Sequence, residues 1–167
     1  IENYEYFVCS DGSYYALVNF GADQAQWLDC SELFYFENGS YQLLSDDLGL
    51  TRTYIVDDEL YVFYSTIGEN DDYDLCLRVY KNKEVFFDAT ILKKSHINYS
   101  VPVFVDGYIL ITGYDGSVVI RENDGWLEIT KPDILIALTD DSFTLTYNGV
   151  EYTTADEMPD EAFIQYK

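Results

Sequence analysis

The residues of this sequence that could carry chemistry are mostly carboxylates and tyrosines, because histidine and cysteine are scarce. His96 is the single histidine, so a Ser-His-Asp or Cys-His mechanism would have to use it. The sequence has no Gly-x-Ser-x-Gly nucleophile elbow and no glycine-rich phosphate loop. We therefore expect His96 to be a solvent-exposed loop residue beside Lys93 and Lys94, and we predict no catalytic residue.

The three cysteines, Cys9, Cys30 and Cys76, are not spaced as zinc ligands. They cannot all pair within one chain, which argues against a disulfide-built scaffold. The sequence leaves two alternatives, a Cys9–Cys30 bridge or three buried thiols.

Calcium is the only cofactor for which the sequence offers candidate ligands. Asp71, Asp72 and Asp74 lie together in one loop, and hard cations prefer such oxygen ligands. This loop lacks the central glycine and terminal glutamate of an EF-hand, so we expect a solvated acidic loop and no cofactor, with a calcium site as the alternative.

Carboxylate pairs are too common to indicate an active site, because the chain holds 31 acidic residues. Among enzymatic activities, glycan hydrolysis by two carboxyl groups is the least unlikely one for this composition. We nevertheless predict that the protein is not an enzyme, since function depends on a specific site and not on acid content.

The formal charge of −22 is distributed unevenly along the 167 residues. Residues 1–77 carry 16 acids and one base, residues 78–131 are neutral, and residues 132–167 carry eight acids and one base. Such a field repels nucleic acids and anionic membranes and attracts basic proteins. We therefore expect a basic protein surface as the partner, with no direct nucleic-acid binding.

No stretch approaches the ~18 consecutive apolar residues of a membrane span, so we expect no membrane insertion. Nearly half of the residues are apolar or aromatic, which predicts a folded, soluble protein. The chain begins at Ile1, and the sequence selects neither a cytoplasmic nor a secreted location, nor an oligomeric state.

The elements that must position these side chains are predicted to be strands, because the apolar residues alternate with a period of two. Aspartate- and asparagine-centred turns separate the strands, for example Asp57-Asp58 and Asn38-Gly39. The expected strands cover residues 4–9, 14–20, 32–37, 40–44, 52–56, 60–67, 75–81, 84–91, 101–105, 108–114, 117–122, 126–130, 134–139, 143–147 and 150–154. A turn or short helix is expected around 159–165, after a capping-box pattern at Thr154 and Glu157.

Short turns require neighbouring strands to run antiparallel, so the pattern predicts an all-β chain of repeated four-stranded meanders. The predicted units of this single domain cover residues 1–50, 51–97, 98–133 and 134–154, followed by a short tail at 155–167. Such units resemble propeller blades, and a two-sheet β-sandwich is the alternative.

The function that follows is a non-catalytic interaction module with an acidic, tyrosine-rich surface. A carboxylate beside a tyrosine can pair with a cation while the ring stacks on it, so a basic partner fits this surface. In the sharpest version, the surface imitates nucleic acid and inhibits a protein that holds one. The alternative is a secreted or cell-surface repeat domain that binds glycan or another ligand, assisted by calcium. The residues predicted to form the acidic face are Asp23, Asp29, Glu32, Asp46, Asp47, Asp57, Asp58 and Glu59.

Overall fold

The protein is described by a computed structural model in which all 16 described elements are strands. The described residues are 3–22, 29–49, 51–67, 73–93, 102–105, 108–113, 116–123, 126–130, 137–139, 142–153, 157 and 164–165. The chain divides into two compact units, unit 1 (Ile1–Lys93) and unit 2 (Lys94–Lys167), and each is described by itself.

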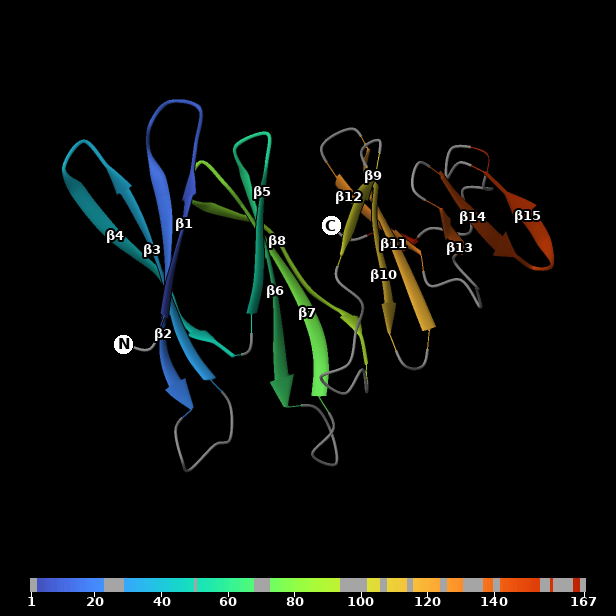
Figure 1. Cartoon of the computed structure of the whole chain (residues 1–167), viewed down its shortest axis with the longest axis horizontal. Helices are drawn as coiled ribbons and strands as arrows, with labels where there is room; N and C mark the ends of the chain where they lie inside the picture. The colour runs from blue at the N-terminus through green and yellow to red at the C-terminus, as the bar shows by residue number, and fades with distance from the viewer. Residues whose placement is uncertain are drawn as a thin grey trace. The chain divides into compact units, whose positions relative to one another are not determined.

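Unit 1 contains two four-stranded antiparallel sheets, each a meander in which the strands lie in chain order (Figure 1). The first sheet consists of β1 (Asn3–Val8), β2 (Tyr14–Ala22), β3 (Asp29–Glu37) and β4 (Ser40–Leu48). The second consists of β5 (Thr51–Val56), β6 (Glu59–Ile67), β7 (Tyr73–Lys81) and β8 (Glu84–Leu92).

Unit 2 contains a five-stranded sheet and a three-stranded sheet. The larger sheet has the order β16-β12-β11-β10-β9, and the smaller has the order β13-β14-β15. Their bounds are β9 (Val103–Val105), β10 (Tyr108–Gly113), β11 (Gly116–Asn123), β12 (Trp126–Thr130), β13 (Ala137–Thr139), β14 (Ser142–Tyr147), β15 (Val150–Tyr152) and β16 (Ile164–Gln165).

The all-β prediction is confirmed, and each of the 15 predicted strands has a counterpart within a few residues of its expected bounds. Turn chemistry explains this agreement. Asn38 and Gly39 have φ angles of 50° and 76°, and Asp57 and Asp58 have 50° and 65°. Two successive positive φ angles make the tight turn whose twist suits an antiparallel hairpin. Closure of the sheets into a propeller stays a prediction.

The end of the chain differs from the expectation of a turn or short helix around 159–165. Ile164 and Gln165 form a strand that pairs with β12, with Ile164 opposite Ile129. The Glu157 carboxylate accepts hydrogen bonds of 3.3 Å from the Thr153 backbone N–H and hydroxyl, whereas Thr154, the predicted N-cap, lies outside the described residues. The side chain of Ile129 is buried in the apolar core of this sheet. Pairing of β16 with β12 therefore adds backbone hydrogen bonds at the edge of a sheet that already has a core.

The core of unit 1 lies between its two sheets. One face of the first sheet contributes residues such as Tyr15, Leu17 and Leu33, and the second sheet contributes residues such as Val62 and Tyr80. These side chains belong to one cluster of buried residues, and the Tyr15 and Tyr80 rings lie 6.5 Å apart. Each fully buried large side chain contributes about 1.5–3 kcal/mol, so packing of sheet on sheet holds unit 1 together.

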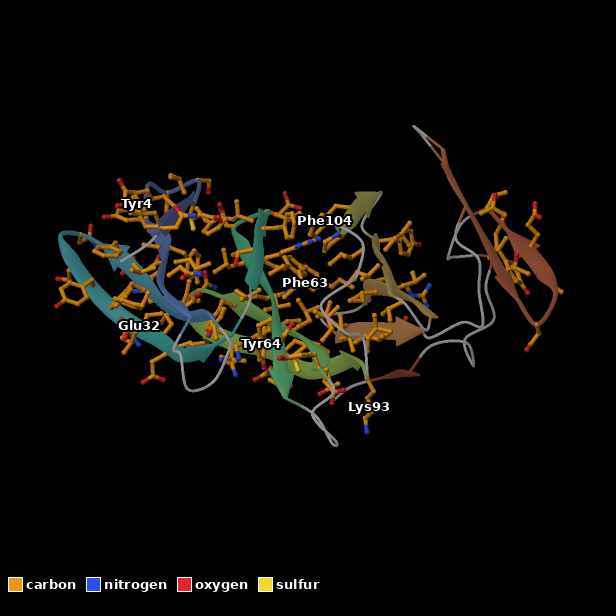
Figure 2. The ribbon with its side chains drawn as sticks, turned by 60° about the horizontal axis from the view of Figure 1, so that its bottom comes forward. Tyr4, Glu32, Phe63, Tyr64, Lys93 and Phe104 are labelled. Atoms are coloured by element: carbon orange, nitrogen blue, oxygen red, sulfur yellow. The ribbon has the colours of Figure 1, made fainter. Side chains whose placement is uncertain are left out.

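The second sheet is buried on both faces along its central strands. Phe63 and Tyr64 are consecutive on β6, so their side chains leave opposite faces of the sheet (Figure 2). They are 0% and 6% exposed. The first sheet is buried on one face only, a difference that defines the candidate site below.

The larger sheet of unit 2 has its own buried apolar residues, including Ile111, Val119 and Ile120. It also holds a buried ion pair, in which Arg121 Nε donates to Glu128 Oε2 at 2.5 Å. None of the described residues belongs to a helix that is long and apolar enough to span a membrane.

Candidate functional site

The outward face of the first sheet is an exposed aromatic surface, here called the aromatic face. Strand alternation places Tyr4 and Tyr6 of β1 on this face, while Phe7, the residue after Tyr6, packs against the core. Tyr4, Tyr6 and Tyr41 are 60%, 59% and 71% exposed. The face is hollowed into an open groove of about 460 Å³, lined by Tyr4, Tyr6, Tyr14, Ala16, Val18, Phe34, Phe36 and Tyr41.

Six rings on this face form a continuous ladder across all four strands. Tyr14 and Phe36 lie opposite each other on β2 and β3, and their rings stack at 4.7 Å with an angle of 4°. The Tyr6 ring meets the Tyr14 ring edge-on at 5.8 Å, and the Phe36 ring lies 5.7 Å from the Tyr41 ring. Tyr4 and Phe34 complete the ladder. Cross-strand ring pairs of this kind stabilise a sheet by about 0.2–1 kcal/mol each, so the ladder contributes to the stability of the first sheet.

The corresponding face of the second sheet is covered. Counted from the asparagine turns that end β3 and β7, Phe36 corresponds to Tyr80, and Phe34 corresponds to Arg78. Tyr80 and its neighbours on that face pack against the first sheet, and Tyr80 is 1% exposed. The aromatic face is thus the counterpart of a buried face, with nothing from the described part of unit 1 covering it.

Carboxylates accompany the rings of the aromatic face, and bases do not. Glu32 lies opposite Val18 and two residues before Phe34 on the same face of β3, and it is half-buried. Asp46 is exposed near the end of β4. Residues 1–50 contain nine acids and neither lysine nor arginine. The groove is therefore an apolar surface in a negative field.

Three other predicted face residues lie in the β5–β6 hairpin and not on the aromatic face. Asp58 accepts hydrogen bonds from the Ser10 backbone N–H at 2.7 Å and from the Ser10 hydroxyl, which ties two hairpin turns together. Glu59 pairs with Lys81 at 2.7 Å. Asp57 is exposed in the turn. Asp57 and Asp58, but not Glu59, border a second hollow of about 420 Å³, which is also lined by Val8, Cys9, Ser10 and Ile55.

The remaining predicted residues are described in part or not at all. Asp29 and Asp47 lie on β3 and β4, but their side chains are outside the described part of the chain. Asp23, Asp71, Asp72 and His96 also lie outside the described residues. The structure thus brings Glu32 and Asp46 to one sheet and separates them from the hairpin acids.

The calcium site stays a prediction, since only one of its three ligands is described. Asp74 is half-buried at the start of β7. Within the described ranges, no group of three or more His, Cys, Asp or Glu side chains is arranged to hold a metal ion. Cys9 and Cys76 are buried free thiols, so the Cys9–Cys30 bridge is not formed. Burial raises the pKa of the Cys9 thiol above its usual range.

Polar contacts join the two sheets of unit 1 and also lie within the second sheet. Lys83 pairs with Glu37 of β3, and this contact raises the pKa of the lysine. Arg78 Nη1 donates to Ser45 Oγ of β4 at 3.0 Å. Burial, together with the hydrogen bond to Asp88, raises the pKa of Tyr64 above its ordinary value. The phenol of Tyr64 is therefore a hydrogen-bond donor inside the interface and not a candidate acid or base at neutral pH.

The sequence predicted a tyrosine-rich surface but did not place Phe34 and Phe36 on it, although it contained a signal for them. Phe34 and Phe36 alternate with Leu33 and Tyr35, so a strand with apolar residues on both faces was predictable. Which of the two faces stays open depends on tertiary packing. Comparison with models of known families, with curated proteins and with solved structures finds no match to this chain.

Proposed function

We propose that the protein is a non-catalytic binding module, and that the aromatic face of β1–β4 holds a basic segment of a partner protein. The observation that carries the proposal is the ladder of six rings, exposed on a sheet whose segment of the chain has no lysine or arginine. Large exposed apolar patches on folded proteins usually mark interaction sites. Aromatic residues on such patches supply much of the binding free energy.

Charge decides between a basic partner and a second copy of the chain. Two copies stacked face to face would bring together two segments with nine acids each. Like-charge juxtaposition across an interface costs several kcal/mol, whereas a basic partner is attracted. The surface of a protein that binds nucleic acid is one such partner, in which case the chain acts as a nucleic-acid mimic and inhibitor.

The propeller-like architecture belongs to the same proposal. The two sheets of unit 1 share strand order and the asparagine turn between their last two strands, and we propose that they are copies of one unit. In such an arrangement each sheet covers a face of the next. The first sheet then offers its uncovered face to a partner.

Titration of the full chain with a fluorescein-labelled peptide of eight alternating arginine and lysine residues tests the proposal. We expect the dissociation constant to rise about ten-fold or more between ~50 mM and ~300 mM salt, because ion pairing is screened. Tyr6→Ala and Tyr41→Ala should weaken binding, since both side chains are more than half exposed and their loss leaves the core intact. Val85→Ala is the matched control, because Val85 is 52% exposed and lies opposite Tyr80 as Tyr41 lies opposite Phe36.

Three outcomes would overturn the proposal. The first is an absence of peptide binding, or binding that the two tyrosine variants leave unchanged. The second is binding of oligosaccharides that the tyrosine variants abolish, which would support the alternative of a glycan-binding domain. The third is self-association that grows with salt and is lost in the same variants, which would identify a second copy as the occupant.

A further inference from the structure

Among the described residues of unit 1, three cations each contact both an aromatic ring and a carboxylate. The three triples are Arg78 with Tyr64 and Asp88, Lys81 with Phe86 and Glu59, and Lys83 with Tyr35 and Glu37. The cation lies 5.1, 3.9 and 4.9 Å from the ring centroid, in that order. These distances are within the ~6 Å at which a cation is attracted by the face of a ring.

The aromatic face has two of the three components. Its rings form the ladder, and Glu32 lies on the same face, two residues from Phe34 and level with Tyr4 across β2. Residues two apart on a strand are separated by about 7 Å, so one cationic group can touch Glu32 and a ring together. The cation is missing from the first sheet because Phe34 occupies the position that corresponds to Arg78.

We infer that the partner supplies arginine to the aromatic face, where the guanidinium stacks on the ring ladder and pairs with Glu32. This inference rests on the proposed function and names the group that the site recognises. An exposed ring face favours a planar guanidinium over an ammonium, because the guanidinium can stack on a ring and still use its edge for a carboxylate. Arg78 shows this combination within the chain, since it lies over the Tyr64 ring and donates from Nε to Asp88 at 2.9 Å.

Two labelled peptides of equal charge test the inference, eight arginines against eight lysines, titrated into the full chain at low salt. We expect the arginine peptide to bind about five-fold more tightly or better, since each stacked guanidinium adds to the ion pairing that both peptides share. A Tyr6→Leu/Tyr41→Leu double variant should bring the two affinities to within about two-fold, because leucine keeps apolar area and removes the ring.

Glu32→Gln separates charge from stacking. This substitution should raise the dissociation constant of the arginine peptide about three-fold or more. Glu151→Gln, at an exposed position of β15 in unit 2, should leave that constant unchanged. Circular dichroism of each variant shows whether the fold is kept.

The outcomes distinguish this inference from the proposal on which it rests. Equal binding of both peptides to the wild-type chain, or an arginine preference that the double leucine variant retains, overturns the inference and leaves the binding module standing. If the Glu32→Gln variant binds the arginine peptide as tightly as the wild-type chain does, the Glu32 carboxylate is not part of the site. If neither peptide binds, the proposed function itself is wrong.

Discussion

Replacement of Arg78 by methionine tests how the two sheets of unit 1 are held together. The Arg78 guanidinium contacts Asp88 at 2.8 Å within its own sheet and Ser45 at 3.0 Å on β4 of the first sheet. Its side chain is 13% exposed and that of Asp88 is 35% exposed. Methionine keeps a long apolar side chain at this position but removes every one of these polar contacts.

The magnitude follows from the contacts. The pair with Asp88 is partly open to water, so its loss costs about 1 kcal/mol. The hydrogen bond to Ser45 and the contact with the Tyr64 ring each contribute about 0.5–1 kcal/mol. We therefore expect Arg78→Met to lower the free energy of unfolding by about 2–3 kcal/mol. Arg78→Lys keeps the charge and should cost about half as much.

Urea denaturation followed by far-UV circular dichroism measures the loss. Hydrogen exchange read by mass spectrometry locates it, and we expect faster exchange in peptides that cover β4 and β7. Lys93→Met, which removes an exposed charge at the end of unit 1, is the control and should change stability little. A loss below about 0.5 kcal/mol, or a double-mutant cycle with Ser45→Ala on β4 that shows no coupling, would refute the view that Arg78 links the sheets.

Two further predictions concern the first sheet. Burial raises the pKa of Tyr15 to about 12 from 10.0, so the fold favours the neutral phenol, and stability is lost as the pH rises from about 10 to 12. Tyr15→Phe should reduce this alkaline loss by up to about 2–3 kcal/mol in urea denaturation at several pH values, and an unchanged pH dependence would contradict it. Gly39→Ala should destabilise the chain by about 1 kcal/mol, because Gly39 has a φ angle of 76°. An added Cβ meets nothing within 4 Å, so a neutral result in thermal denaturation would show that backbone strain at this turn is absent.

The strands could be predicted from the sequence because their ends are set by local chemistry. Asn38-Gly39 and Asn82-Lys83 supply successive positive φ angles, and alternating apolar residues supply the strands between the turns. The pairing at the end of the chain could not be predicted in this way. Ile164 pairs with β12 across more than thirty residues of sequence, and no local signal records such a partner.

The acidic face was only partly predictable, because the number of acidic residues in a sequence does not give the distances between their side chains or the residues with which they pair. Glu32 lies among the rings, but Asp58 is committed to Ser10 and Glu59 to Lys81. A carboxylate that already holds a hairpin or a lysine contributes less to binding than its charge suggests. The aromatic face was harder still, since alternation shows that a strand has two faces and does not show which one is covered.

The difference in burial between the two sheets affects how fast proteases cleave the protein. The central strands of the second sheet are buried on both faces, while the first sheet is buried on one. Elements with fewer buried contacts open more often, and proteases cleave the open form. We therefore expect limited proteolysis of the free chain to begin within residues 1–50. A bound partner would cover the exposed face of the first sheet and, by mass action, lower the population of the open form, which slows cleavage. The turnover of the chain would then follow the abundance of its partner.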